Sequence, residues 1–92
     1  MIKWLGEKKD FCVWADEYPK HSTLLKYYGN DEKVFVPKGI NAIAEFAFYN
    51  NIYIKKIFLP ESVEMFFKSA VQGCENLESI LYKRDSKVKR LK

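Results

Sequence analysis

The sequence predicts a β-rich α/β solenoid, a fold in which short units of similar structure stack along one axis. A block of residues repeats after 23 positions, since Val-Phe-Val-Pro at 34–37 returns as Ile-Phe-Leu-Pro at 57–60. A third copy begins with Ile-Leu-Tyr-Lys at 80–83. Units of roughly 20–29 residues cannot bury their own apolar face, so they stack on a neighbour. Hydrophobic residues form 48% of the chain and aromatic residues 16%, which indicates a folded domain.

The spacing of 23 residues also holds between the prolines, where apolar residues recur at equivalent positions. The equivalent pairs are Ile40 and Val63, Ile43 and Phe66, Ala47 and Ala70, Phe48 and Val71, Asn51 and Cys74, and Ile54 and Leu77. Function in such a fold lies on a surface, which favours a binding or scaffolding role over catalysis.

Residues 24–82 resemble the BspA-type leucine-rich repeat family. Its pattern is an apolar strand ending in Ile-Pro, then Ser/Gly-Val, Ile-Gly, Ala-Phe, a Cys or Asn, and Leu. The matching segments are 36–40, 43–44, 47–48 and 50–51, then 59–63, 66–67, 70–71, 73–74 and 76–77, with a typical lead-in at 24–31. The resemblance implies a leucine-rich-repeat stack with a parallel sheet on one face, short helical turns on the other, and a role in protein binding.

Four residues depart from the family pattern. Ala44 and Phe67 stand where the family usually has glycine, and Val71 stands where it has phenylalanine. Lys83 replaces the proline that would close a third strand, so we expect the array to stop soon after Tyr82.

The segment before the repeats is expected to form an aromatic β cap over the N-terminal end of the stack. Residues 11–14 are β-prone, and residues 15–20 form a loop that contains a proline. Residues 23–28 and 33–36 flank Gly-Asn-Asp-Glu at 29–32, which predicts a β-hairpin between them. The residues expected to cover the end of the stack are Trp4, Phe11, Val13, Trp14 and Tyr18.

Within the repeats, residues 54–59 and 77–82 are predicted strands that lie side by side in a parallel sheet. Each is followed by a turn, and the repeats contain a short extended piece near 40–43 or 63–66 and one helical turn around 45–49 or 68–72. The chain is therefore one domain, residues 1–92. It divides into an N-terminal cap and hairpin (1–30), leucine-rich repeats (31–82) and a basic C-terminal tail (83–92).

Alternation along these strands places one set of residues in the core and another on the outer face of the sheet. The expected inward residues are Ile54, Ile57 and Leu59, then Leu77, Ile80 and Tyr82. The expected outward residues form a row, Phe35, Phe58 and Leu81, which we call the ladder. Lys33, Lys56 and Ser79 border it.

An exposed apolar row of this kind is unusual, because the resemblance implies small or polar residues at these positions. Three interpretations are open: the N-terminal segment folds across the ladder, the ladder is a contact surface, or its exposure is simply tolerated. A contact surface would serve an unknown protein partner or a second copy of the chain in a homodimer. The candidate partner-binding residues are Phe35, Phe58, Leu81, Lys56 and Lys33.

Positive charge is concentrated in the C-terminal tail. Residues 1–82 contain 10 Lys/Arg and 11 Asp/Glu, so the net charge of +4 arises from residues 83–92. A basic run can bind phosphates, which makes a nucleic-acid-associated accessory protein the alternative function. Its candidate residues are Lys83, Arg84, Lys87, Lys89 and Arg90. The same run also fits an ordinary solvated terminus, and we favour a third interpretation, a short cap in which Val88 and Leu91 dock on the open end of the array.

The sequence contains no pattern typical of an enzyme, a metal site or a cofactor site. The four glycines are scattered rather than grouped in a phosphate-binding loop, and His21 is the single histidine. Cys12 and Cys74 lack metal-ligand spacing, and we expect both to be structural and unpaired. The paired carboxylates lie in predicted turns, which favours solvated loop residues over catalytic groups.

No apolar segment predicts export or membrane insertion. Residues 1–11 include five charged side chains, so the apolar core of a secretory signal is missing there. No apolar run approaches the roughly 18 residues of a membrane-spanning helix. We expect a cytoplasmic protein, and the alternative is a piece of a longer protein.

Overall fold

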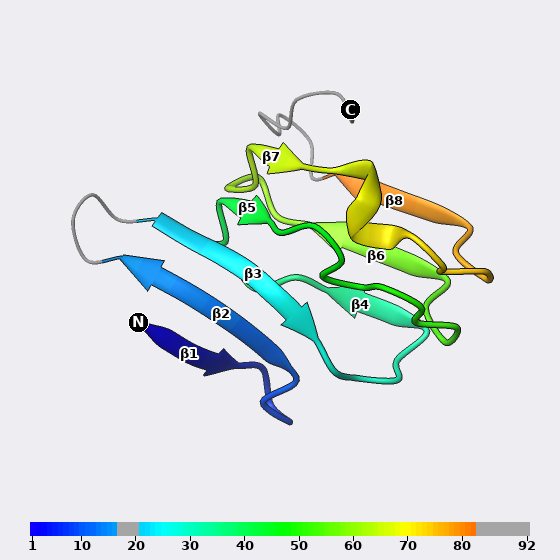
Figure 1. Cartoon of the computed structure of the whole chain (residues 1–92), viewed down its shortest axis with the longest axis horizontal. Helices are drawn as coiled ribbons and strands as arrows, with labels where there is room; N and C mark the ends of the chain where they lie inside the picture. Colours follow the sequence, from blue (N-terminus) through cyan, green and yellow to red (C-terminus); the bar gives the residue numbers. More distant parts are fainter. Residues whose placement is uncertain (17–20, 83–92) are drawn as a thin grey trace.

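Two β-sheets enclose the apolar residues of the repeats in the computed structural model, which describes residues 1–16 and 21–82 (Figure 1). The larger sheet has five strands in the order β1-β2-β3-β5-β7, and the smaller has three in the order β4-β6-β8. The five strands are β1 (Ile2–Leu5), β2 (Phe11–Asp16), β3 (His21–Tyr27), β5 (Ala42–Ile43) and β7 (Met65–Phe66). The three are β4 (Lys33–Phe35), β6 (Lys56–Leu59) and β8 (Ser79–Tyr82).

The 23-residue repeat sets the register of both sheets. In the three-stranded sheet Val34 pairs with Ile57, and Ile57 pairs with Ile80, all in parallel. In the five-stranded sheet Ile43 pairs with Phe66, again 23 residues apart and parallel. The repeat period is thereby confirmed, although the strands begin two residues later than predicted, at Lys56 and Ser79.

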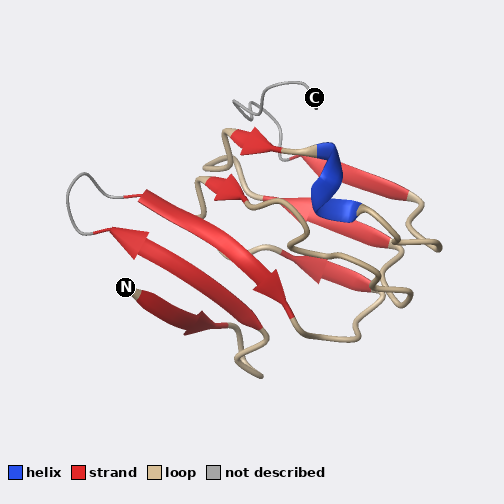
Figure 2. Ribbon diagram, in the orientation of Figure 1, coloured by secondary structure: helices blue, strands red, loops and turns tan. Residues whose placement is uncertain are grey.

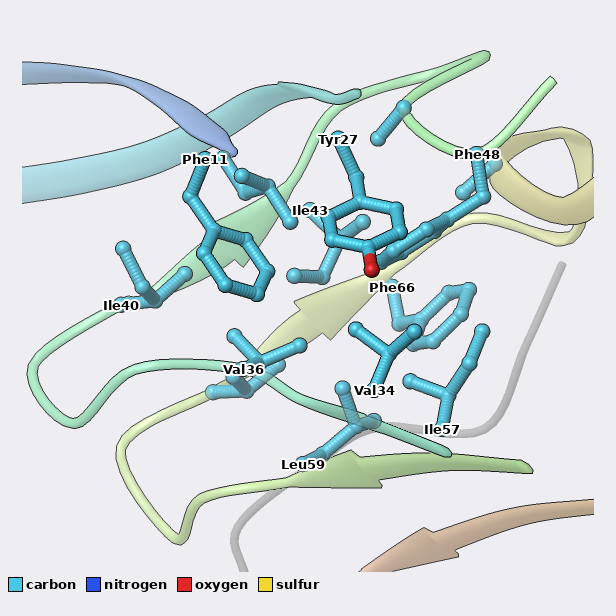
Figure 3. Close-up of a cluster of buried hydrophobic side chains, with 14 of the residues drawn as sticks. Phe11, Tyr27, Val34, Val36, Ile40, Ile43, Phe48, Ile57, Leu59 and Phe66 are labelled. Carbon is cyan, nitrogen blue, oxygen red and sulfur yellow. The ribbon is translucent and has the colours of Figure 1, made fainter. Parts of the chain in front are cut away.

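One apolar core lies between the two sheets (Figure 3). Phe11 and Val13 enter it from β2, so the N-terminal segment covers the first repeat as a β cap. The Tyr27 ring links the cap to the repeats, because its centroid lies 5.0 Å from that of Phe11 and 5.7 Å from that of Phe48. The inward assignments of Ile54, Ile57 and Leu59 agree with their burial.

The hairpin predicted between residues 23–28 and 33–36 is wrong. The strand β3 pairs antiparallel with β2 on one side and parallel with β5 on the other, so it has no free edge for β4. Residues 28–32 instead cross from the larger to the smaller sheet. This crossing is held by Asn51, whose Nδ2 donates to the Gly29 carbonyl at 3.0 Å, and by the Tyr27 hydroxyl, which donates to Asp31 Oδ2 at 3.1 Å.

The two tryptophans do not cover the end of the stack, which corrects the expectation for the cap. Alternation along β2 sends Phe11 and Val13 inward, so Trp14 points out and is 36% exposed. On β1, Trp4 is 50% exposed and its ring lies 5.7 Å from that of Tyr28. The expectation for Tyr18 lies outside the described residues.

Tyr82, expected to be buried, is 44% exposed. It pairs with Leu59 in the sheet, but Leu59 has a strand on each side whereas β8 is the last strand that the structure describes. Leu77 and Ile80 are partly buried for the same reason.

Residues 1–16 and 21–82 contain no α-helix, so the helical component of the prediction is not confirmed. One 3-10 turn, η1, spans Lys68–Val71, and residues 45–50 form turns (Figure 2). Backbone amides of residues 45–50 are used between repeats: Phe48 donates to the Ala70 carbonyl at 2.8 Å and Asn50 to the Gln72 carbonyl at 2.9 Å. They therefore do not form the i to i−4 bonds of an α-helix.

Side chains also bond from one repeat to the next. Asn76 Nδ2 donates to the Ile52 carbonyl at 2.7 Å, and Ser62 Oγ donates to the Ile40 carbonyl at 2.8 Å. Cys74 Sγ donates to the Phe48 carbonyl at 2.9 Å, and burial raises the pKa of this thiol. Cys12 and Cys74 are both free, which agrees with structural roles.

Replacing Ile57 with aspartate is expected to unfold the domain. Ile57 is completely buried in the stacked core, and an unpaired charge there costs several kcal/mol, a large part of the total stability of about 5–15 kcal/mol. The exposed Glu61 provides the control, since Glu61→Ala removes no buried contact. Circular dichroism melts measure both effects. An Ile57→Asp variant that melts with the parent would contradict the register.

The stability of the domain is expected to fall between pH 10 and 12 because of Tyr27. Burial raises the pKa of this phenol to about 12, from about 10 in an unfolded chain, and the Asp31 carboxylate adds to the rise. The native state therefore holds the proton more tightly, so this contribution is full below pH 10 and is lost as the pH approaches 12.

Tyr27→Phe lacks the phenol and should lose less stability over this interval than the parent does. Urea midpoints of both proteins at several pH values measure this loss. Lysine deprotonation affects the two proteins equally, so it cancels when their midpoints are subtracted. Parallel declines in the two proteins would show that Tyr27 titrates normally.

Candidate functional site

The ladder lies on the outward face of the three-stranded sheet. Phe35 on β4 pairs with Phe58 on β6, and Phe58 pairs with Leu81 on β8. The two phenyl rings stack with centroids 4.5 Å apart and planes 7° from parallel. Phe35 is 64% exposed and Leu81 41% exposed, while Phe58 is half-buried between them. The structure thus brings the three predicted residues together.

The N-terminal segment leaves the ladder uncovered. Strands β1 and β2 extend the five-stranded sheet, and the core separates this sheet from β4, β6 and β8. Both tryptophans lie on that other sheet. The interpretation in which this segment hides the ladder is therefore wrong.

The ladder itself lines part of an apolar groove of about 710 Å³, which continues past the ends of the strands. The turns that follow Pro37 and Pro60 form one side of it, and Leu81 and Tyr82 lie at its end. Gly39 permits the turn because its φ is +92°, a value that side-chain-bearing residues rarely adopt. Its backbone N–H donates to Ser62 Oγ at 3.1 Å, which ties the two turns together.

Sequence reasoning missed this groove, although its signal is present in the chain. The strands β4 and β6 are each followed by a proline and then a small residue near the turn, Gly39 in one repeat and Ser62 in the next. Stacked turns of this kind extend the outward face beyond the strands. The groove therefore adds Pro37, Pro60 and Tyr82 to the predicted site.

Lysines lie along the side of the ladder that faces away from the prolines. Lys33 pairs with Lys56, and Lys56 pairs with Ser79, which places the lysines in the row next to the apolar one. The ion pair recorded within residues 1–16 and 21–82 joins the neighbouring Lys55 to Glu32 at 3.8 Å. Lys33 and Lys56 thus give this border a positive potential, which favours acidic groups on a partner.

A smaller hollow of about 420 Å³ lies between the N-terminal turn and the ladder. Tyr27, Asp10, Asp31 and Lys33 line part of it. The Tyr27 phenol, whose pKa burial raises to about 12, donates a hydrogen bond to Asp31 Oδ2 and accepts one from the Asp31 amide. Across the described residues, no group of three or more His, Cys, Asp or Glu side chains could hold a metal ion.

The candidate nucleic-acid-binding residues lie outside the described residues, since Lys83, Arg84, Lys87, Lys89 and Arg90 all fall within 83–92. The proposed docking of Val88 and Leu91 lies there as well. In the part of the chain that the structure describes, no helix is long and apolar enough to cross a membrane.

Comparison with protein families gives a match over residues 23–91 to the model of the BspA type leucine rich repeat region. This range includes both complete repeats and the lead-in that the sequence pattern indicated. A comparison with curated proteins finds no match.

Two solved structures share the fold. A leucine rich cell surface protein from Faecalibacterium prausnitzii A2-165 superposes with a TM-score of 0.79 at 20% identity, over 99% of this chain. The leucine rich repeat protein of T. pallidum superposes with a TM-score of 0.79 at 23% identity, over 97% of this chain. The chain spans 26% and 42% of the lengths of these two proteins.

Proposed function

The chain belongs to the BspA-type leucine-rich repeat family, and we propose that it is a protein-binding module whose contact surface is the ladder and its groove. The observation that carries the proposal is the stacking of Phe35, Phe58 and Leu81 in the open beside an apolar hollow. Soluble proteins seldom leave such a patch exposed without a partner.

The geometry matches the usual anatomy of a protein contact. Binding energy concentrates in a few central aromatic side chains, with polar groups around them. Phe58 is the central rung, already half-desolvated by its neighbours, and Phe35 offers the larger free surface. We expect a partner to insert apolar side chains into the groove and to place acidic groups against Lys33 and Lys56.

Phe35→Glu is expected to abolish partner binding and leave the domain folded. The side chain is mostly in water, so the substitution costs the monomer little, whereas in a complex it buries a charge against apolar groups. Phe58→Ala should weaken binding by roughly 2 kcal/mol or more if this rung is an anchor. Peptides selected from a displayed library against the immobilised parent supply a ligand, and titration calorimetry measures its affinity for each variant.

Tyr53→Glu is the matched control, because Tyr53 is also an exposed aromatic residue but lies in the turn before β6, outside the ladder. It should bind the selected peptides as the parent does. Equal affinity of the parent, Phe35→Glu and Phe58→Ala for every selected peptide would refute the ladder as the contact surface.

The alternative function rests on the charge of the tail. Removing residues 84–92 deletes five Lys/Arg and one Asp, a net charge of +4, which leaves the rest of the chain with a net charge of zero. If the protein binds nucleic acid, the parent should retain a labelled oligonucleotide at low salt and release it at high salt, and the truncated chain should retain none. Retention by both proteins would exclude the tail, and a lower melting temperature of the truncated chain would instead support the capping role of Val88 and Leu91.

We also propose that the protein works in the cytoplasm, where the unpaired thiols of Cys12 and Cys74 would stay reduced. One protein of similar fold is described as a cell surface protein, which makes the surface the competing location. Fractionation of cells that produce the tagged full-length gene product distinguishes the two. Recovery at the cell surface would overturn the proposal.

A further inference from the structure

A second apolar face, on the opposite side of the core from the ladder, is formed by the five-stranded sheet. The buried row of this sheet contains Val13, Leu24, Ile43 and Phe66. Because successive side chains point to opposite faces, the next row points to solvent. Strand pairing places Ile2, Trp14, Thr23, Ala42 and Met65 in that row, one from each strand.

This outward row crosses the whole sheet without a charged residue. Ile2 and Met65, at its two ends, are each 50% exposed, and Trp14 between them is 36% exposed. We call this row of five residues the axial row. Five strands about 4.8 Å apart make it roughly 19 Å long. An uncharged strip of this length is a suitable centre for the packing of a second sheet.

Aromatic side chains continue the same face to one side of the axial row. Trp4 pairs with Cys12, and Cys12 pairs with Lys26, which places the three in one row. Lys26 Nζ lies 3.4 Å from the Phe46 carbonyl oxygen and 6.0 Å from the centroid of the Tyr49 ring. Phe46 and Tyr49 meet edge to face at 5.4 Å, and both are exposed.

The stacking of the repeats does not require these two aromatic residues. The equivalent residues of the next repeat are Ser69 and Gln72. Phe46 moreover has φ of +63°, a backbone conformation that is strained for a bulky side chain. The first repeat thus keeps an exposed ring at a conformational cost, beside Lys26 of β3.

The size of the face fits an interface between proteins. Each aromatic side chain presents about 150–250 Å². The five on this face, left 36–59% exposed, therefore expose roughly 350–600 Å² together. Ile2, Met65 and the smaller residues of the axial row bring the face close to the about 800 Å² per partner of a standard complex. The five aromatic residues are Trp4, Trp14, Tyr28, Phe46 and Tyr49.

The charges on the face are complementary to a second copy of the face. Among outward positions of the described strands, Lys26 lies on one side of the axial row and Asp16 on the other. On β2, Asp16 lies two residues after Trp14, and Cys12 lies two residues before Trp14. Lys26 is the partner of Cys12 on β3, so it lies on the opposite side of the axial row from Asp16. A two-fold axis along the axial row brings each Lys26 opposite the Asp16 side of the other copy.

We propose that two copies of this chain pack through the outward faces of their five-stranded sheets, with the two-fold axis along the axial row. Each residue of that row then lies near its own counterpart, as in any isologous interface. The contact is a sheet-on-sheet packing that buries the tryptophans of both chains. It uses none of the ladder, so it is independent of the proposed partner-binding function.

The test uses the full chain and its two tryptophans, both of which lie on the proposed interface. Sedimentation velocity should show a mass that rises with concentration from 10.9 kDa toward twice that value. Tryptophan emission should shift to the blue over the same range, and acrylamide should quench it less. Phe35→Glu, on the ladder, should leave both curves unchanged.

Thr23→Glu keeps both tryptophans and places two like charges side by side on the axis. It should raise the dissociation constant by about 100-fold or more while the circular dichroism spectrum stays that of the parent. Asp16→Lys and Lys26→Asp should each weaken the dimer, and the chain carrying both changes should regain affinity because the opposed pairs are restored with reversed sign.

Several outcomes would overturn the proposal. One is a parent that stays monomeric at 1 mM. Another is a dimer that survives Thr23→Glu but dissociates in Phe35→Glu, which would place the contact on the ladder. A monomer whose tryptophan emission shifts only on addition of phosphatidylcholine and phosphatidylglycerol vesicles would assign the face to a lipid surface instead. A double charge variant no better than its single variants would exclude the two-fold axis proposed.

Discussion

The stacking of one 23-residue unit on the next is the constraint on which the rest of this structure depends. A unit contributes four residues or fewer to one sheet and two to the other, which is too little to form either sheet alone. Its hydrogen bonds run to neighbouring units, as when the Val36 amide donates to the Phe58 carbonyl at 3.0 Å. The sheet, the core and the register are therefore acquired together.

The same register explains why the ladder exists at all. A side chain that recurs every 23 residues lies beside its own repeat equivalent, on whichever face it points to. Inward positions thus build a continuous core, and outward positions build columns such as Phe35, Phe58 and Leu81. Repetition amplifies any choice of residue: one outward phenylalanine is an ordinary surface residue, whereas aligned copies form an apolar strip.

The part of the structure that depends on repetition could be predicted from the sequence, and the part that depends on the cap could not. Equal spacing gave the pairing of Val34 with Ile57 and the outward row correctly. The hairpin was wrong because Gly-Asn-Asp-Glu looks like a tight turn, while β3 already has partners on both sides. Local propensity does not show which strands pair along the two edges of β3, because that pairing depends on residues far apart in the chain.

The tryptophans show that the buried face of a cap strand was also difficult to predict from the sequence. Large aromatic residues usually lie inside, so composition favoured Trp4 and Trp14 as the cover of the stack. Period-2 alternation in β2 instead commits Phe11 and Val13 to the core and sends Trp14 outward. The phase of a short strand is difficult to assign when both faces are apolar, because hydrophobic alternation is then weak.

The two apolar faces lie on opposite sides of one core, which makes the two proposed contacts compatible with each other. They point in opposite directions, since the two sheets share one core and turn their inner faces toward it. Two copies packed through the five-stranded sheets would consequently carry their ladders on opposite outer sides. Neither ladder would be blocked, and a partner with two matching segments could engage both. The second contact would then form at a high effective concentration, so a ladder of modest affinity would suffice for stable capture.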